Sequence, residues 1–195
     1  EMDYFKKDRI QLERKGKGNS VYLGNNPACI NSYLTLIEEL KKYQSFIDVN
    51  CMLNYELVKN SNYLSLIENG KNYFDSKFTP NTKFYDLKDY PAYMDKCDIY
   101  ICGEKRQTGL AAIYTTLKLG KKLFLDGNNY DFIKSLGCKV FQVREIGEML
   151  LLEFLQPLTV KEKEQNPDNY PKDGIQPGSI FGVSESAKKE SACPA

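Results

Sequence analysis

Residues 98–125 read DIYICGEKRQTGLAAIYTTLKLGKKLFL, and this stretch decides the fold class. The apolar run over 98–102 predicts a strand. Apolar residues at helical spacing follow from Leu110 until Gly120 ends the helix. A second apolar strand is expected over 122–125. A strand, a helix and another strand in this order predict a parallel pair joined by a helical crossover. Because both strands are mainly apolar rather than alternating, we expect helices on both faces of the sheet.

The same alternation extends over residues 19–155, which we interpret as one α/β domain with a Rossmann-like, doubly wound parallel sheet. Further strands are expected over 20–24, 46–53, 82–85 and 139–143. Further helices are expected over 30–40, 63–74, 130–136 and 146–154. Another helix begins at Asp86 or Asp89, and Pro91 favours the later start because proline suits a first turn.

Two flanking segments differ in composition from this domain. Residues 1–18 are polar and basic, and we expect a linker or an arm. Residues 156–195 hold five of the eight prolines and lack helical periodicity, which predicts an extended or partly disordered tail. This tail could instead pack on a neighbouring domain outside the chain.

The composition of the 195 residues, 42% hydrophobic and 27% charged, is typical of a soluble globular domain. The formal net charge of +1 predicts no nucleic-acid partner. The absence of histidine excludes Ser-His-Asp and Cys-His sites and imidazole-bound zinc, and without an obvious carboxylate cluster we expect no metal. The six cysteines form no C-x-x-C pair, so we expect reduced, mostly buried thiols. With neither a signal peptide nor a membrane span of about 18 residues, the protein is expected to be cytoplasmic.

Chemistry is expected where the strand order 3-2-1-4-5-6 reverses, beyond the carboxyl ends of the first and fourth strands. The loop over 103–109 follows the fourth strand. Arg106, one of only four arginines, and the N–H groups around Thr108 and Gly109 suit a diphosphate, and Thr108 is expected to cap the helix. Gln107 could hold sugar or phosphate oxygens. A solvated Lys-Arg turn with an ordinary cap is the alternative interpretation of this loop.

The loop over 24–27 follows the first strand and contains neither the G-x-G-x-x-G fingerprint of dinucleotide enzymes nor the Walker lysine of P-loop proteins. Asn25 and Asn26 can donate to and accept from sugar or phosphate oxygens, although Asn-Asn-Pro is also a common turn. Tyr55 at the end of the second strand and Tyr85 before a helix could border a nucleotide base.

The segment SVYLGNNP at 20–27, followed by Asn31 and a helix, resembles the first strand, loop and helix of a bacterial glycosyltransferase family. This family comprises the TDP-N-acetylfucosamine:lipid II N-acetylfucosaminyltransferases, also called 4-α-L-fucosyltransferases (glycosyltransferase family 56). Asn25 matches the first Asn of its G-N-S motif. Asn26 stands in place of the Ser, and the histidine further along that motif is absent.

A stronger match joins the strand at 98–101 to RQTGL at 106–110, which resembles the family segment D-x-x-x-F followed by R-Q-Q-G-x-G. Thr108 replaces the second Gln, and Ala111 or Ala112 replaces the second Gly. The resemblance extends over about residues 4–150.

The resemblance implies a GT-B glycosyltransferase, built from two Rossmann-like domains, in which this chain would be the carboxyl-terminal, donor-binding half. Residues 1–18 would be the interdomain linker, and a missing amino-terminal domain would bind the acceptor. The donor would be a dTDP-sugar such as dTDP-N-acetylfucosamine, transferred without a metal to a lipid-linked or polysaccharide acceptor of the bacterial envelope. Peripheral contact with the inner face of the inner membrane would follow.

The residues expected to bind the donor are Asn25, Asn26, Tyr55, Tyr85, Arg106, Gln107, Thr108 and Gly109. The sequence shows no catalytic base; if the transfer inverts the anomeric carbon, the base is expected in the missing domain. Two alternatives remain. One is another sugar-nucleotide enzyme, such as a non-hydrolysing epimerase, against which the absence of histidine counts. The other is a non-enzymatic Rossmann-like interaction domain without nucleotide affinity.

Overall fold

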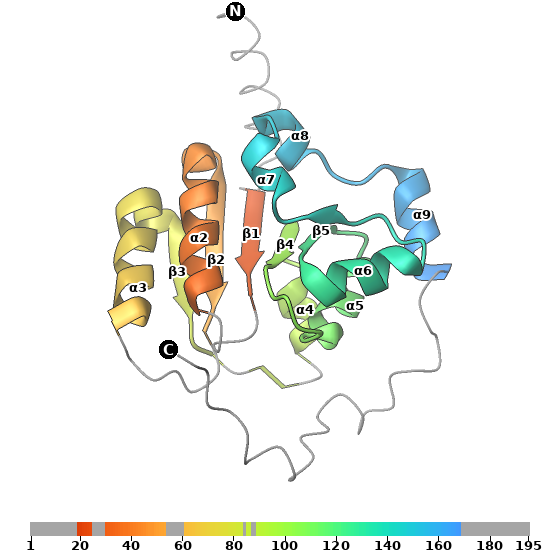
Figure 1. Cartoon of the computed structure of the whole chain (residues 1–195), viewed down its shortest axis with the longest axis horizontal. Coiled ribbons are helices and arrows are strands. Elements are labelled where there is room, and N and C mark those ends of the chain that lie inside the picture. Colours follow the sequence, from red (N-terminus) through yellow and green to blue (C-terminus); the bar gives the residue numbers. More distant parts are fainter. Residues whose placement is uncertain (1–18, 25–29, 54–60, 84, 87–88, 169–195) are drawn as a thin grey trace, which may run out of the picture.

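Among the residues that the structure describes, six parallel strands form one sheet in the order β3-β2-β1-β4-β5-β6 (Figure 1). The computed structural model describes residues 19–24, 30–53, 61–83, 85–86 and 89–168. The strands are β1 (Asn19–Leu23), β2 (Ile47–Met52), β3 (Phe78–Asn81), β4 (Ile99–Cys102), β5 (Lys122–Leu125) and β6 (Phe141–Gln142). The predicted Rossmann-like α/β class and the predicted strand order are confirmed.

Helices connect these strands, as parallel neighbours require. The α-helices are α2 (Ile30–Leu40), α3 (Ser61–Phe74), α4 (Tyr90–Met94), α5 (Leu110–Lys118), α6 (Gly127–Ser135), α7 (Glu145–Glu148), α8 (Leu151–Leu155) and α9 (Val160–Asp168). Short 3-10 turns follow α2 and α3, over Lys41–Tyr43 and Asp75–Lys77. Pro91 stands in the first turn of α4, which confirms the later of the two starts that the sequence allowed.

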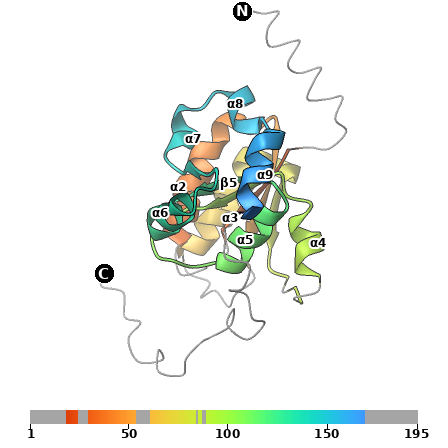
Figure 2. The same ribbon diagram turned by 90° about the vertical axis from the view of Figure 1, so that its right-hand side faces the viewer.

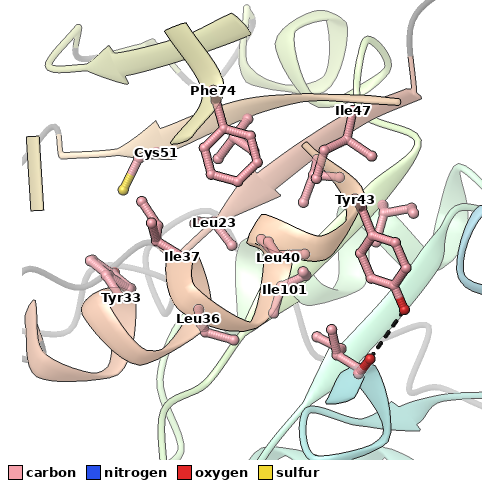
Figure 3. Packing of buried hydrophobic residues seen from close by; sticks show 14 of the residues in the cluster. Leu23, Tyr33, Leu36, Ile37, Leu40, Tyr43, Ile47, Cys51, Phe74 and Ile101 are labelled. Atoms are coloured by element: carbon pink, nitrogen blue, oxygen red, sulfur yellow. Dashed lines mark hydrogen bonds between the residues drawn. The ribbon is translucent and has the colours of Figure 1, made fainter. Parts of the chain in front are cut away.

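Apolar side chains cover both faces of the sheet because successive residues of a strand point to opposite sides. Val21 and Leu23 of β1 belong to a hydrophobic cluster with residues of α2, α3, α7 and α8, whereas Tyr22 between them belongs to a second cluster with residues of α4, α5 and α6. Figure 3 shows the first of these clusters around Leu23. Figure 2 shows α2 and α7 on one side of the sheet and α4 on the other. The sheet is thus buried on both faces, as its mainly apolar central strands predict.

The third strand lies earlier than the sequence predicted. The strand expected over 82–85 is wrong, because β3 pairs with β2 over Phe78–Asn81. Phe78 is buried in the core, and Pro80 is tolerated because β3 is an edge strand that needs one less N–H donor. Tyr85 lies outside β3, and its ring stacks on that of Tyr93.

The single helix predicted over 146–154 is instead two short helices, α7 and α8. Extended backbone at Met149 and Leu150 separates them. Tyr43 Oη donates to the Met149 carbonyl at 2.6 Å, and Lys42 Nζ donates to the Gly147 carbonyl at 2.6 Å. Side chains from the 3-10 turn after α2 therefore bind the carbonyls at the end of α7, where the helix stops.

Helix α9 contradicts the extended tail expected from residue 156 onward, because residues 160–168 are helical. Thr159 and Glu162 form a capping box, in which the Glu162 carboxylate accepts from the Thr159 N–H at 2.8 Å. Asn166 is buried and accepts the Lys139 N–H at 2.8 Å, which fixes α9 beside the turn before β6. The predicted arm at 1–18 and the rest of the tail, 169–195, lie outside the described residues.

Candidate functional site

The two loops at the switch point of the sheet leave adjacent strands, since β1 pairs with β4. Gly24, the first residue after β1, is tightly held. Its N–H donates to the Ile101 carbonyl at 2.8 Å, and its own carbonyl accepts from Tyr100 Oη at 3.0 Å. Gly24 has a φ of 72°, and a Cβ there would overlap the Tyr33 ring. The backbone at Gly24 is therefore held in one conformation. The predicted residues Asn25 and Asn26 lie outside the described residues.

The loop after β4, residues 103–109, has an exposed centre, a buried Glu104 before it and a half-buried Thr108 after it. Lys105, Arg106 and Gln107 are exposed, whereas Glu104 is buried at 2% exposure. Within the described part of the chain, Arg106 forms no ion pair with a carboxylate. A guanidinium in this state is free to meet an anionic ligand with its planar fork.

Helix α5 begins at the end of this loop without a side-chain cap. Gly109 occupies the N-cap position in the left-handed region, with a φ of 69°. The predicted cap by Thr108 is wrong, because its hydroxyl is buried and makes no hydrogen bond. The physical reason is the position of the cap, which falls on a residue without a side chain. The first-turn N–H groups of α5, at the positive end of the helix dipole, therefore lack a side-chain acceptor.

The first turn of α6 donates hydrogen bonds to two backbone carbonyls of the same loop. The Asn128 N–H donates to the Lys105 carbonyl at 3.0 Å, and Asn129 Nδ2 donates to the Thr108 carbonyl at 3.0 Å. Gly127 has a φ of 50°, and a Cβ there would overlap the backbone of Lys105. Two carbonyls, one on each side of Arg106, are thus fixed by an element about twenty residues further along the chain.

Three acceptor oxygens around this loop are buried and unpartnered: Glu104 Oε1, Thr108 Oγ1 and Asn129 Oδ1. Leaving a buried polar group without a hydrogen bond costs about 1–3 kcal/mol, so such groups are rare in folded proteins. In the described residues, the remaining side-chain atom of this kind is Asn166 Nδ2, in α9. The unpartnered oxygens therefore concentrate at the loop that carries Arg106.

A second group of polar and aromatic side chains lies at the carboxyl ends of β2 and β3. The half-buried ring of Tyr85 stacks on Tyr93, with ring centroids 4.0 Å apart. Asn81 Nδ2 donates to the hydroxyls of both tyrosines, at 3.2 and 2.6 Å, and Tyr93 Oη donates to Asn50 Oδ1 at 2.9 Å. Burial raises the pKa of Tyr93 well above its usual range, so this hydroxyl remains a neutral donor. Tyr85 is therefore held in one orientation.

Five of the eight predicted donor-binding residues lie in the described part of the chain, and four of them share one loop. Arg106, Gln107, Thr108 and Gly109 share the loop between β4 and α5. Tyr85 lies after β3, in the aromatic group, and Tyr55 lies outside the described residues.

The anchoring role of α6 was missed by sequence reasoning. The local signal was the run DGNN at 126–129, directly after a strand, with Asp126 as a helix cap. Its partner residues at 105 and 108 cannot be derived from this run, because their contact joins two separate loops.

Other kinds of chemistry find less support in the described residues. No group of three or more His, Cys, Asp or Glu residues there could hold a metal ion. Cys102 is buried beside the site, and burial, with a smaller effect of the Glu104 charge, raises the pKa of its thiol to about 11. It is therefore a poor thiolate nucleophile at neutral pH. None of the helices in the described ranges has both the length and the apolar character needed to cross a bilayer.

The chain is similar in structure to three glycosyltransferase structures. The chain matches the C-terminal domain of a glycosyl transferase group 1 family protein (LpcC) from Francisella tularensis, with a TM-score of 0.56 and 13% identity. The match covers 82% of this chain and 87% of that one. It also matches an α,α-trehalose-phosphate synthase (UDP-forming) from Burkholderia vietnamiensis, with a TM-score of 0.54 and 10% identity over 84% of this chain. A trehalose-6-phosphate synthase studied with bisubstrate glycomimetics matches with a TM-score of 0.54 and 12% identity over 82% of this chain.

The chain spans 43% of the length of each synthase, against 87% of the isolated C-terminal domain. Its fold is therefore that of the C-terminal domain of GT-B glycosyltransferases. No protein-family model and no curated protein sequence matches it. The resemblance to glycosyltransferase family 56 stays a prediction.

Proposed function

We propose that this chain is the donor-binding domain of a GT-B glycosyltransferase and that it binds the diphosphate of a nucleotide sugar at the loop between β4 and α5. The observation that carries this proposal is the combination of an exposed Arg106 with an α5 amino end that has no side-chain cap. Both lie at the switch point where open α/β sheets bind ligands. Arginine and helix N-terminal N–H groups are the usual partners of phosphate in proteins.

The chemistry of glycosyl transfer suits this arrangement. The nucleoside diphosphate leaves as the bond to the sugar breaks, and negative charge then accumulates on its oxygens. Donors that are already in place stabilise that charge without having to reorganise. The Lys105 and Thr108 carbonyls are anchored to α6, so the backbone on both sides of Arg106 is fixed. Gln107, exposed beside Arg106, would contact sugar or phosphate oxygens.

The remaining parts of the donor site are assigned as follows. The fixed ring of Tyr85 would border the nucleotide base, together with Tyr55. Asn25 and Asn26 would contact sugar or phosphate oxygens from the loop after β1. A second domain outside this chain would bind the acceptor and supply a base if one is needed.

The finer identity follows the resemblance to glycosyltransferase family 56. It would be a metal-independent transfer of a deoxyamino sugar, such as N-acetylfucosamine, from a dTDP-sugar to a lipid-linked or polysaccharide acceptor. Peripheral contact with the inner face of the bacterial inner membrane would accompany a lipid-linked acceptor.

Calorimetric titration of the full chain with dTDP, UDP and GDP tests this proposal. One nucleotide is expected to bind selectively. Arg106→Ala is expected to lower the affinity for that nucleotide by about tenfold to a hundredfold, because a hydrogen bond to a charged group contributes about 1.5–3 kcal/mol. Arg144→Ala is the matched control, since Arg144 is also exposed but lies at the start of α7, outside the loop. Absence of binding by all three nucleotides would instead favour an interaction domain. Equal affinities of the two variants would show that Arg106 does not bind the diphosphate.

A further inference from the structure

We propose that Glu104, Thr108 and Asn129 form a subsite that binds the sugar of the nucleotide sugar by accepting hydrogen bonds from its hydroxyl or amine groups. This inference rests on the proposed function, because it places the sugar next to a diphosphate held at Arg106. It adds that these residues recognise the sugar, and that they do so through hydrogen-bond donors on the sugar.

The three residues surround the exposed centre of the loop. Glu104 and Thr108 flank the exposed residues 105–107 on either side. Asn129 reaches the loop from α6, where its Nδ2 is engaged by the Thr108 carbonyl at 3.0 Å and by Cys102 Sγ at 3.9 Å. The amide is therefore held in one orientation, and its oxygen is the atom left without a partner.

Burial makes these oxygens unusual. Glu104 is 2% exposed and Asn129 is 0% exposed, yet each leaves an oxygen without a hydrogen bond. In the described part of the chain, Glu104 also has no lysine or arginine within ion-pair distance. Buried polar groups are normally satisfied, and a buried carboxylate is normally paired. A bound ligand that supplies hydrogens would remove this deficit.

The character of the unpartnered atoms determines what can bind. A carboxylate oxygen and an amide oxygen only accept hydrogen bonds, and the Thr108 hydroxyl can accept as well as donate. The complementary group must therefore carry hydrogens, as sugar hydroxyls and amino groups do. A phosphate would be repelled by the Glu104 carboxylate, whereas Arg106 and the α5 amino end attract it.

The loop thus places groups that attract a phosphate and groups that accept hydrogen bonds within a few residues of each other. Its exposed residues and the start of α5 offer positive charge and donors, whereas the unpartnered oxygens of Glu104, Thr108 and Asn129 offer acceptors. A nucleotide sugar has the matching asymmetry, because its diphosphate accepts hydrogen bonds and its sugar hydroxyls donate them. A nucleoside diphosphate alone would leave the acceptors unused.

The test compares the two ligands on variants of the full chain. Thr108→Val removes the unpartnered hydroxyl with little change of shape, and Glu104→Gln removes the charge and keeps the size. Each is titrated with dTDP, UDP and GDP, and with dTDP-glucose, UDP-glucose and GDP-mannose. Both variants are expected to bind the sugar nucleotide about tenfold more weakly than the wild type. Their affinity for the matching nucleoside diphosphate is expected to change less than about twofold.

The outcomes separate this inference from the proposed function. Arg106→Ala should weaken both ligands, since both carry the diphosphate. If the wild-type chain binds a nucleoside diphosphate but Thr108→Val and Glu104→Gln affect both ligands alike, or neither, the sugar subsite is refuted and the diphosphate site stands. Binding of a nucleoside diphosphate without binding of its sugar nucleotide has the same meaning. If the wild-type chain binds none of the six ligands, the proposed function fails, and the subsite fails with it.

Discussion

Helices α5 and α6 begin in similar ways and serve different purposes. Each follows a central strand of the sheet, and each has a glycine with positive φ at its start, Gly109 at 69° and Gly127 at 50°. In α6 the chain itself satisfies the amino end, because Asp126 accepts from the Gly127 N–H at 2.9 Å and the Lys105 carbonyl accepts from the Asn128 N–H. In α5 no side chain does so.

This difference separates a scaffold from a binding site within one region of the molecule. The satisfied end of α6 fixes the loop over 103–109, and that loop presents the unsatisfied end of α5. A glycine at a helix start is therefore a poor indicator of anion binding by itself. The partners of the first-turn N–H groups decide which helix is available to a ligand.

The largest effect is expected for Gly127→Ala, which should lower the free energy of unfolding by about 3 kcal/mol. About 1–2 kcal/mol comes from the left-handed backbone, and the rest from overlap with the backbone of Lys105. Urea denaturation measures this loss. Gly120→Ala is the matched control, because Gly120 has a φ of 62° but its Cβ would meet only the flexible Lys163 side chain. Equal losses of unfolding free energy in the two variants would show that close packing of α6 against the Lys105 backbone adds nothing to the cost.

The second largest effect is expected for Asn129→Ala, which should lower the free energy of unfolding by about 2 kcal/mol. The Thr108 carbonyl loses its donor, and removal of the buried amide leaves a small cavity. Asn128→Ala is the control. Its side chain is exposed and only its backbone N–H is bonded, so its stability should stay within about 0.5 kcal/mol of wild type. Chemical denaturation of both variants makes the comparison, and similar losses would argue against side-chain anchoring of the loop.

A smaller loss, about 1 kcal/mol, is expected for Asp126→Ala, which removes the cap of α6. Asp126→Asn should restore most of this stability, because asparagine caps helices about as well as aspartate. Thermal unfolding of the two variants is a sufficient measurement. If asparagine fails to restore stability, Asp126 acts through something other than the cap.

The smallest effect concerns Thr108, whose hydroxyl makes no hydrogen bond. Thr108→Val should leave the free energy of unfolding unchanged or raise it by less than about 1 kcal/mol, because no bond is lost and an unsatisfied group is removed. Thr116→Val provides the contrast, since the buried Thr116 hydroxyl donates to the Ala112 carbonyl at 2.7 Å. That variant should lose about 1 kcal/mol in the same denaturation experiment. A comparable loss in Thr108→Val would mean that its hydroxyl has a partner in the folded protein.

Sequence reasoning predicted the parts of the fold that depend on local pattern. The strands over 98–102 and 122–125 were identified because buried parallel strands are continuously apolar. The third strand was misplaced because an edge strand accepts Pro80, which local propensity rejects. Helix α9 was missed although Thr159 and Glu162 have the spacing of a capping box, since the surrounding prolines dominated the interpretation.

The candidate site was only half predictable for the same reason. Arg106 and its loop were found from composition and from their place after the fourth strand. The contact of Asn129 with Thr108 was not predicted, because the two residues are 21 positions apart in the sequence. The unpartnered oxygens were also beyond reach, since a missing partner is a property of the packed structure rather than of a motif.

The most direct measurement is a nuclear magnetic resonance titration of the full, ¹⁵N-labelled chain with dTDP, UDP and GDP, which follows individual backbone amides. The amides of Gly109, Leu110 and Ala111 are expected to shift saturably with one nucleotide. Those of Gly127 and Asn128, which are already bonded within the protein, should shift far less. Saturable shifts centred on α6, or none at the start of α5, would contradict the assignment of the diphosphate to α5.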